Sequence, residues 1–365
     1  MSNESENGGG PWSEGATAML EETTKNMQRM AKIPGLLQKV QKVKRGATPS
    51  EIAYEEDRLK LLHYISDEPP KHRTPVLFVF ALVNRPYILD ILPHKSVVSH
   101  FVDAGFDTYL IDWHRPTHAD RHHTLDTYIN GYLQNIIDHL IQRTGSPKVS
   151  IVGYCMGGAM SAMFSALHPE KVANLILMAA GIDFETREGL LNQWSDPKSF
   201  DVDAFVDAFG NCPAEFLQST FQMMNPVGNF LQKPINFFER IDNDAFVEEF
   251  LTMETWLNDN VSIPGEVYRE FVKYLYQRNL LVKNEMPVGR HVVNLKNITC
   301  PVLNLMATRD DLVPPAQSEP FNDLVGSTDR KTIKFEAGHI GLAVSRRAHT
   351  DLWPKVCEWL GERSD

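Results

Sequence analysis

A pentapeptide of sequence Gly-Tyr-Cys-Met-Gly, at residues 153–157, constrains the fold of this chain more than any other feature. The apolar residues 149–152 before it are typical of a short buried strand, and residues 158–168 after it favour a helix that Pro169 ends. A strand, a tight turn and a helix in this order predict a nucleophile elbow with Cys155 as the nucleophile. The pattern therefore indicates an α/β fold that presents a reactive thiol.

The elbow supplies the conditions that a nucleophilic cysteine needs. Cys155 stands at the N-terminus of the predicted helix, where the helix dipole and free N–H groups favour a thiolate and the oxyanion that its attack creates. We expect Gly153 and Gly157 to be required because the turn is tight and neighbouring backbone must approach without a Cβ atom in the way.

The other cysteines give no comparable signal. The four cysteines are widely spaced and match neither a metal site nor a disulfide framework. In a cytoplasmic protein we expect them to be free thiols. We expect Cys212, Cys300 and Cys357 to be small buried side chains. The sequence predicts no metal site and no cofactor.

Composition narrows the class of protein. The 365 residues are enough for one large α/β domain with an insertion, and the net charge of −11 argues against a general nucleic-acid binder. No apolar run approaches the roughly 20 residues that span a bilayer. Residues 1–15 are polar, have no apolar signal-peptide core and are predicted to be a disordered tail. We expect a cytoplasmic protein without a transmembrane segment.

Strands and helices alternate regularly through two parts of the chain. Such alternation predicts a doubly wound, mainly parallel sheet whose ligand crevice lies outside the C-terminal ends of its strands. The predicted strands are residues 76–80, 107–112, 149–152, 172–178, 301–306 and 331–335, and the predicted helices are residues 96–104, 125–143, 158–168 and 345–360.

The alternation stops between residues 181 and 297, where the pattern is helical and rich in aromatic residues. We expect a helical cap inserted into a catalytic core made of residues 51–180 and 298–365. Residues 1–50 are predicted to be a flexible tail followed by a basic amphipathic segment, which Pro34 interrupts. That segment either packs on its own domain or meets a partner or an anionic or apolar surface.

A base and an acid follow the elbow in the order that such a site requires. Asp310 and Asp311 come after the predicted strand 301–306, and His339 comes after the strand 331–335 in a Gly-His-x-Gly loop. We therefore predict Cys155, an aspartate and His339 as a catalytic triad. The other histidines considered are predicted to lie at helix ends or on the surface: His122, His123, His168 and His349.

Two parts of the site stay open at this level. Either Asp310 or Asp311 can orient the imidazole, since neighbouring side chains on a loop rarely point at one ring. The oxyanion hole needs two N–H donors, and one is the backbone of Met156. The second belongs to the loop of residues 81–85, in which we select the Val83 backbone.

Cysteine at an elbow has a chemical consequence. A thiolate that attacks a thioester exchanges one thioester for another, so the acyl-enzyme keeps its activation for transfer to a hydroxyl group. A serine would form a less activated ester. The residue therefore favours acyl transfer from an acyl-CoA, although a cysteine hydrolase fits the same pattern.

Several blocks of the chain together resemble the polyhydroxyalkanoate synthases. Gly-Tyr-Cys-Met-Gly-Gly is similar to their modified lipase box, and the likeness extends over roughly residues 50–362. The other blocks that carry it are residues 83–90, 110–113, 256–260, 263–265, 310–314 and 338–341. The resemblance implies an α/β-hydrolase fold and an acyltransferase that polymerises (R)-3-hydroxyacyl-CoA, chiefly 3-hydroxybutyryl-CoA, into polyester through an acyl-Cys155 thioester.

The same resemblance implies partners and a location. The short chain is similar to the PhaC subunit of class III enzymes, which work with a PhaE-type subunit; class IV, with a PhaR-type subunit, is the second choice. It implies a homodimer associated with polyester granules in the cytoplasm. The family usually has histidine after its catalytic aspartate, and here Asp311 stands in that place, which favours Asp310 as the triad acid.

Two other functions are weighed against polymer synthesis. A cysteine hydrolase of the dienelactone type would release free acid and would not elongate a chain. A non-catalytic, hydrolase-like granule protein would not need an intact set of Cys155, Asp310 and His339.

Overall fold

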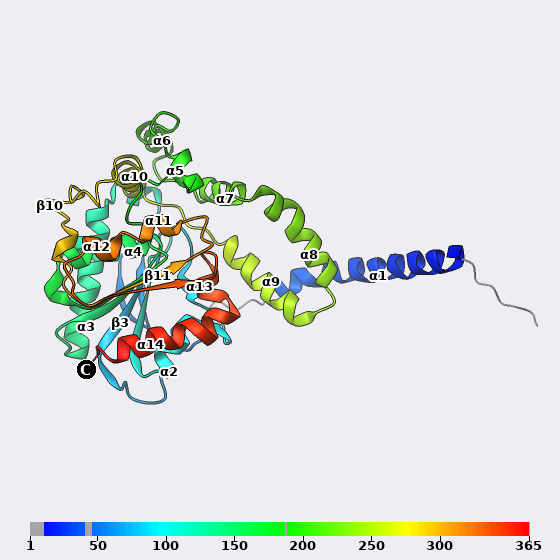
Figure 1. The fold of residues 1–365 in the computed structure, drawn as a ribbon, viewed down its shortest axis with the longest axis horizontal. Helices are drawn as coiled ribbons and strands as arrows, with labels where there is room; N and C mark the ends of the chain where they lie inside the picture. The colour runs from blue at the N-terminus through cyan, green and yellow to red at the C-terminus, as the bar shows by residue number, and fades with distance from the viewer. Residues whose placement is uncertain (1–10, 41–45, 187, 365) are drawn as a thin grey trace, which may run out of the picture. The chain divides into compact units, whose positions relative to one another are not determined.

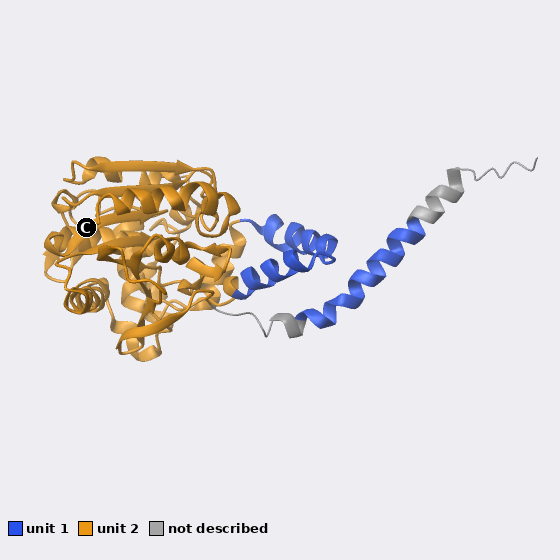
Figure 2. Cartoon of the chain, turned by 90° about the horizontal axis from the view of Figure 1, so that it is seen from below, with its two compact units in different colours: residues 1–44, 225–255 blue, residues 45–224, 256–365 orange. Residues whose placement is uncertain are grey.

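The computed structural model describes residues 11–40, 46–186 and 188–364. The chain forms two compact units (Figure 2): Met1–Lys44 with Asn225–Thr255, and Arg45–Met224 with Trp256–Asp365. These boundaries differ from the predicted division into a tail, a core and a cap, since residues 225–255 group with the N-terminal segment. A single cap of residues 181–297 stays a prediction.

The larger unit is built on an eight-stranded sheet with the order β1-β2-β6-β3-β7-β8-β11-β12 (Figure 1). The six strands from β6 to β12 in this order pair in parallel, whereas β1, β2 and β6 pair antiparallel. The strands are β1 (Ser50–Glu56), β2 (Leu59–Tyr64), β3 (His72–Val79), β6 (Phe106–Asp112), β7 (Val149–Tyr154), β8 (Val172–Met178), β11 (Val302–Ala307) and β12 (Arg330–Phe335). The predicted α/β class with a mainly parallel sheet is confirmed.

Burial explains which strands the sequence shows most clearly. Every residue of β7 and of β11 is buried, because parallel strands are covered on both faces and so consist of nearly continuous apolar runs. The hairpin of β1 and β2 was not predicted. Its edge strand β1 is largely exposed and carries Glu51, Glu55 and Glu56, so it has no continuous apolar run.

The predicted helices of the larger unit are present with small changes. Helix α2 (Val97–Asp103) packs on β6, and its N-cap Ser96 accepts a hydrogen bond from the Ser99 amide. The predicted helix 125–143 is divided into the π-helical segment η3 (Thr127–Leu133) and α3 (Gln134–Thr144). Helix α4 (Met156–Leu167) packs on β7 and β8 and begins directly after Cys155.

Shorter elements complete the larger unit. They are η1 (Pro86–Leu89), β4 (Asp90–Leu92), β5 (Lys95–Ser96), η2 (His118–His122), η4 (Pro169–Lys171), α5 (Leu190–Trp194), α6 (Val202–Phe209), α7 (Ala214–Met223), α10 (Gly265–Glu270), η6 (Phe271–Gln277), β9 (Pro287–Val288), β10 (His291–Val292), η7 (Leu295–Asn297), α11 (Pro315–Ser318), α12 (Phe321–Leu324), α13 (Gly341–Val344), η8 (Ala348–Leu352) and α14 (Trp353–Gly361).

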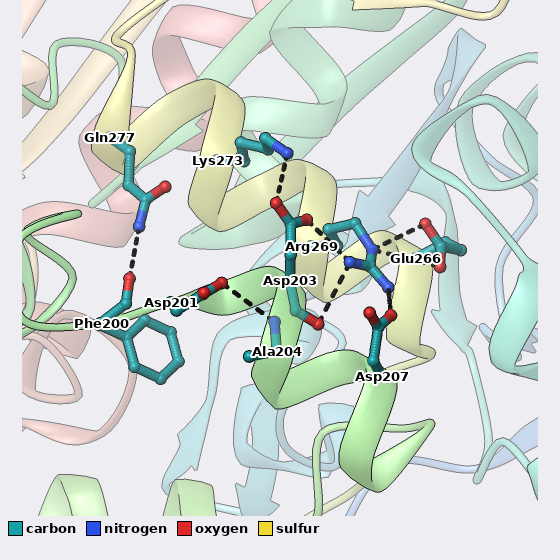
Figure 3. A network of polar contacts seen from close by, with 9 residues as sticks. All are labelled: Phe200, Asp201, Asp203, Ala204, Asp207, Glu266, Arg269, Lys273 and Gln277. Carbon is teal, nitrogen blue, oxygen red and sulfur yellow. Dashed lines mark hydrogen bonds and ion pairs between the residues drawn. The ribbon is translucent and has the colours of Figure 1, made fainter.

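Charged side chains join α6 to α10 and η6 (Figure 3). Arg269 lies 2.8 Å from Asp203 and 2.6 Å from Asp207, both on α6, and 3.1 Å from Glu266 on its own helix. Lys273 lies 2.6 Å from the other oxygen of Asp203. On the same elements, the apolar side chains Val202, Val206 and Val272 form a small buried cluster.

The smaller unit consists of helices. They are α1 (Pro11–Val40), η5 (Gly228–Gln232), α8 (Lys233–Arg240) and most of α9 (Asp244–Leu257). Ile241, Val247 and Leu251 form its buried cluster, against which Leu36 of α1 packs. Arg29 on α1 is buried and lies 3.2 Å from Asp242.

Two expectations about the N-terminal segment need correction. Residues 11–15 of the predicted tail belong to helix α1, and residues 1–10 lie outside the described residues. The helix also continues through Pro34, which was expected to interrupt it. Residues 41–45 of the amphipathic segment lie outside the described residues. Among the helices that the structure describes, none combines the length and apolar character needed to cross a bilayer.

Candidate active site

Cys155 occupies a strained turn between β7 and α4. Its backbone φ is 56° and its ψ is −124°, values that non-glycine residues rarely adopt and that cluster at functional sites. The turn is held on both sides, because the Cys155 amide donates to Met178 O at 2.9 Å and Cys155 O accepts from the Gly158 amide at 2.9 Å. The half-buried thiol is therefore presented at the C-terminal edge of the sheet, at the start of a helix.

The structure leaves no room for a side chain at either elbow glycine. A Cβ atom on Gly157 would lie 2.6 Å from Phe80 O, which belongs to backbone that cannot move aside cheaply. A Cβ atom on Gly153 would lie 2.6 Å from Ser161 Oγ and 2.7 Å from Gly158 Cα. The helix, the elbow strand and the segment after β3 thus approach one another more closely than any side chain allows.

The structure separates the two neighbouring aspartates. Asp310 Oδ2 lies 2.7 Å from His339 Nδ1, and the Asp310 carboxylate is almost fully buried. Its other oxygen accepts hydrogen bonds from the backbone N–H groups of Leu312 and Val313, at 2.9 Å and 2.8 Å. The neighbouring Asp311 is exposed. The geometry therefore pairs His339 with Asp310.

His339 also forms a side-chain hydrogen bond with Cys155, so the three predicted residues meet. Burial by itself lowers the pKa of His339, and it is the largest single effect. The negative charges of Cys155 and Asp310, together with the hydrogen bonds to both, outweigh it and raise this pKa to about 10. The arrangement thus favours a protonated His339 between Cys155 and Asp310.

Two tyrosines at the site were not predicted. The Tyr154 ring stacks on the His339 ring with centroids 5.1 Å apart, and its hydroxyl donates to His339 O at 3.1 Å. Its place inside the elbow motif was an available signal. Tyr276 on η6 packs on Phe184, and burial together with the charges of Cys155 and Asp310 raises its pKa. Tyr276 stands among many aromatic residues, so no sequence signal distinguished it.

The two candidate oxyanion donors lie on the expected elements. Met156 is the first residue of α4, and the N–H groups of a first helical turn have no partner within the helix. Val83 lies in the loop between β3 and η1, and its carbonyl accepts the Val261 amide at 3.0 Å. The indole of Trp113 donates to Phe80 O at 2.9 Å and holds the start of the same loop.

The other cysteines have thiols that ionise with difficulty. All four cysteines are free, and Cys212 and Cys357 are buried as predicted, whereas Cys300 is only half-buried. Burial raises the pKa of Cys212 and of Cys357 to about 12 and that of Cys300 to about 11.

The other histidines named above lie outside the loop that carries His339. His168 caps the C-terminal end of α4 and His122 ends η2. His349 is the second residue of η8 and so lies at a helix end; it is half-buried, and its Nδ1 lies 3.1 Å from His100 Nε2. The described residues contain no group of three or more metal-binding side chains.

Comparisons with known proteins identify the fold and the family of the chain. Residues 74–345 match the alpha/beta hydrolase fold family, and residues 6–101 match the family described as the N-terminus of poly-beta-hydroxybutyrate polymerase (PhaC). Among solved structures, a soluble variant of monoglyceride lipase from Saccharomyces cerevisiae aligns with a TM-score of 0.56. It is 13% identical over 89% of this chain and 97% of that one, so the likeness concerns the fold.

Curated relatives are more similar to this chain in sequence than the lipase is. The poly(3-hydroxyalkanoate) polymerase subunit PhaC of Haloferax mediterranei is 47% identical over 89% of this chain and 66% of its own length. The protein of the same name from Allochromatium vinosum is 42% identical over 87% of this chain and 90% of its own length. On these matches, the chain belongs to the PhaC family of poly(3-hydroxyalkanoate) polymerases, which confirms the family that the motifs predicted.

Proposed function

We propose that this chain polymerises (R)-3-hydroxyacyl-CoA, chiefly 3-hydroxybutyryl-CoA, through a covalent thioester on Cys155. The chain belongs to a family of acyltransferases that form polyesters, and this family membership supports polyester synthesis. The observation that supports the covalent route is the set of Cys155 at a strained elbow, His339 hydrogen-bonded to it, and Asp310 2.7 Å behind His339.

The acylation half-reaction begins from a Cys155 thiolate beside the His339 imidazolium. The Cys155 thiolate attacks the thioester carbonyl, and the oxyanion that forms accepts hydrogen bonds from the Met156 and Val83 amides. The carbon–sulfur bond to CoA then breaks, and the His339 imidazolium gives its proton to the leaving thiolate. Asp310 holds the imidazole in the tautomer and orientation that this transfer needs.

The transfer half-reaction uses the neutral imidazole that acylation leaves. His339 accepts the proton of a 3-hydroxyl group, on a growing chain or an incoming monomer, as its oxygen attacks the acyl-Cys155 carbonyl. An ester bond forms, the Cys155 thiolate leaves and the ion pair is restored. Because the acyl group is held as a thioester, ester formation remains downhill.

Aromatic side chains near the thiol favour transfer over hydrolysis. Tyr276, Phe184 and Phe271 lie in ring contact with one another, with centroids between 4.7 and 6.1 Å apart. Tyr276 is close enough to Cys155 and Asp310 to feel their charges. Such a covering lowers the access of water to the acyl-enzyme.

The proposal includes a second subunit and a location. The relative from Allochromatium vinosum, of which this chain covers 90%, is named as a subunit. We propose a PhaE-type partner, with a PhaR-type partner as the second choice, and a homodimer bound to polyester granules in the cytoplasm.

The test is to supply 3-hydroxybutyryl-CoA with and without a candidate second subunit and to follow CoA release and polymer. We expect polymer from the wild type and none from Cys155→Ala, with Cys212→Ala as a matched control that keeps activity. Free 3-hydroxybutyrate as the sole product would contradict polymer synthesis and favour the hydrolase. Undiminished turnover in Cys155→Ala would contradict the nucleophile.

A further inference from the structure

The loop that carries Val83 is held by a segment more than 170 residues later in the chain. We infer that this segment, residues 256–261, is a clamp that positions the Val83 amide as an oxyanion donor, with Asn260 as its central positioning residue. The inference rests on the proposed function, in which Val83 supplies one of the two N–H groups. Its physical basis is a set of hydrogen bonds between two irregular stretches of backbone.

The first contact lies on the oxyanion residue itself. The Val261 amide donates to Val83 O at 3.0 Å, which fixes the carbonyl of the residue whose N–H is the proposed donor. The next residue along the loop, Asn84, donates its side-chain amide to Asn260 Oδ1. Asn260 is 6% exposed and is itself oriented, because its own amide group donates to Leu257 O at 3.0 Å.

The second contact holds the loop one residue further on. The Trp256 indole donates to Arg85 O at 2.7 Å, so the carbonyls of Val83 and Arg85 are both bound by the clamp. The side chain of Arg85 lies 2.6 Å from Asp112 at the end of β6, which ties the loop to the sheet. The loop is therefore fixed from the sheet side and from the clamp side.

The third contact anchors the clamp. Asp259 is 6% exposed, and its carboxylate accepts the Tyr87 hydroxyl at 3.2 Å and forms an ion pair with Arg115. Tyr87 belongs to η1, which directly follows the oxyanion loop, and Arg115 follows β6. The middle of the clamp is thus attached both to η1, which follows the loop, and to the segment after β6.

These hydrogen bonds do more than pair the polar groups of the loop, because they also hold Val83 in one position. An oxyanion donor contributes only when it is fixed before the charge forms, and a displacement of about 1 Å can cost about 100-fold in rate. Val83 has no regular secondary structure to hold it, whereas Met156 is held by helix α4. The clamp supplies for Val83 the rigidity that the helix supplies for Met156.

The test compares Asn260→Ala with the wild type in two reactions of the same thiol. Oxyanion stabilisation is needed for acyl transfer and not for alkylation by iodoacetamide. We expect kcat for CoA release from 3-hydroxybutyryl-CoA to fall about 10- to 100-fold with KM changed less than about twofold. The alkylation rate of Cys155 should stay within about twofold of the wild type.

Two further variants sharpen the result. Asn260→Asp keeps an oxygen for Asn84 and should recover part of the lost kcat. Asn84→Ala should cause a similar loss, and the double variant should be little worse than either single one, because both remove one contact. Asn322→Ala is the matched control, since it removes a 2.7 Å side-chain amide hydrogen bond to Thr332 on β12. It should leave kcat unchanged.

The outcomes separate this inference from the proposed function. An unchanged kcat in Asn260→Ala would overturn the clamp, as would an equal fall in the alkylation rate, which would indicate a disturbed elbow. A p-nitrophenyl ester serves as a second acyl donor that needs the same oxyanion hole. If the wild type cleaves this ester but makes no polymer, the proposed function fails while the clamp is still tested.

Discussion

One carboxylate oxygen of Asp310, Oδ2, lies 2.7 Å from His339 Nδ1. The other oxygen, Oδ1, accepts hydrogen bonds from two backbone N–H groups. The second set of bonds matters as much as the first. It fixes the direction of the carboxylate and stabilises its negative charge in a buried position, so that the carboxylate can hold His339 without taking its proton.

Replacing each of the two neighbouring aspartates should give opposite results. Asp310→Asn places an amide against His339 and should lower the rate of CoA release by at least about 100-fold, because the imidazole loses its tautomer and its charge partner. Asp311→Asn changes an exposed side chain and should keep nearly full activity. Steady-state CoA release checks both, and equal losses would contradict the assignment.

The His339 ring should stay protonated well above neutral pH. Because its pKa is raised to about 10, we expect the ring to remain an imidazolium between about pH 7 and pH 9. An NMR titration of the ring resonances of His339 measures this directly. A midpoint near the ordinary value of about 6.5 would contradict the raised pKa.

The raised pKa of His339 also affects the stability of the folded protein. The folded-state pKa of His339 lies above the unfolded value of about 6.5, so its protonation stabilises the fold. This contribution is fully present below about pH 6.5 and is lost as the pH rises through about 10. Urea unfolding should therefore show that the stability advantage of the wild type over His339→Gln shrinks between pH 7 and pH 10. An advantage that grows over this range would contradict the direction of the shift.

Adding one methyl group at the elbow should disrupt it. Gly157→Ala places a Cβ atom against the backbone of Val79 and Phe80, and we expect a loss of more than about 2 kcal/mol in the free energy of unfolding. Gly131→Ala is the control, because a Cβ atom there meets nothing within 4 Å. Urea denaturation of both variants measures the difference, and similar small losses would show that the elbow can relax.

The ion pairs of Arg269 should make the position of α6 sensitive to salt. Arg269→Met keeps most of the side-chain volume and removes three carboxylate contacts, so we expect a loss of about 1 kcal/mol at low salt and less at 0.5 M, a salt concentration at which the Debye length is only about 4 Å. Arg347→Met, which removes more exposed ion pairs, should cost less than about 0.5 kcal/mol. A loss independent of salt would indicate packing rather than charge.

The sequence determined those features that depend on local pattern. The apolar runs of β7 and β11, the elbow around Cys155 and the order of nucleophile, acid and histidine could all be identified, because parallel buried strands and tight turns impose their own composition. The exposed edge strand β1 was missed, and Pro34 was expected to break a helix that continues through it, since neither feature follows a local rule.

Tertiary structure alone decided the features that depend on contact between distant segments. The family pattern only favours Asp310 over Asp311, whereas the structure buries Asp310 against His339 and leaves Asp311 exposed. Tyr276 comes within reach of the charges of Cys155 and Asp310 only in the folded chain. Asn260 acquires its place beside Asn84 only when residues 256–261 bind the loop after β3. A residue's identity states which bonds it can form, whereas its partner is chosen by the packing that brings two segments together.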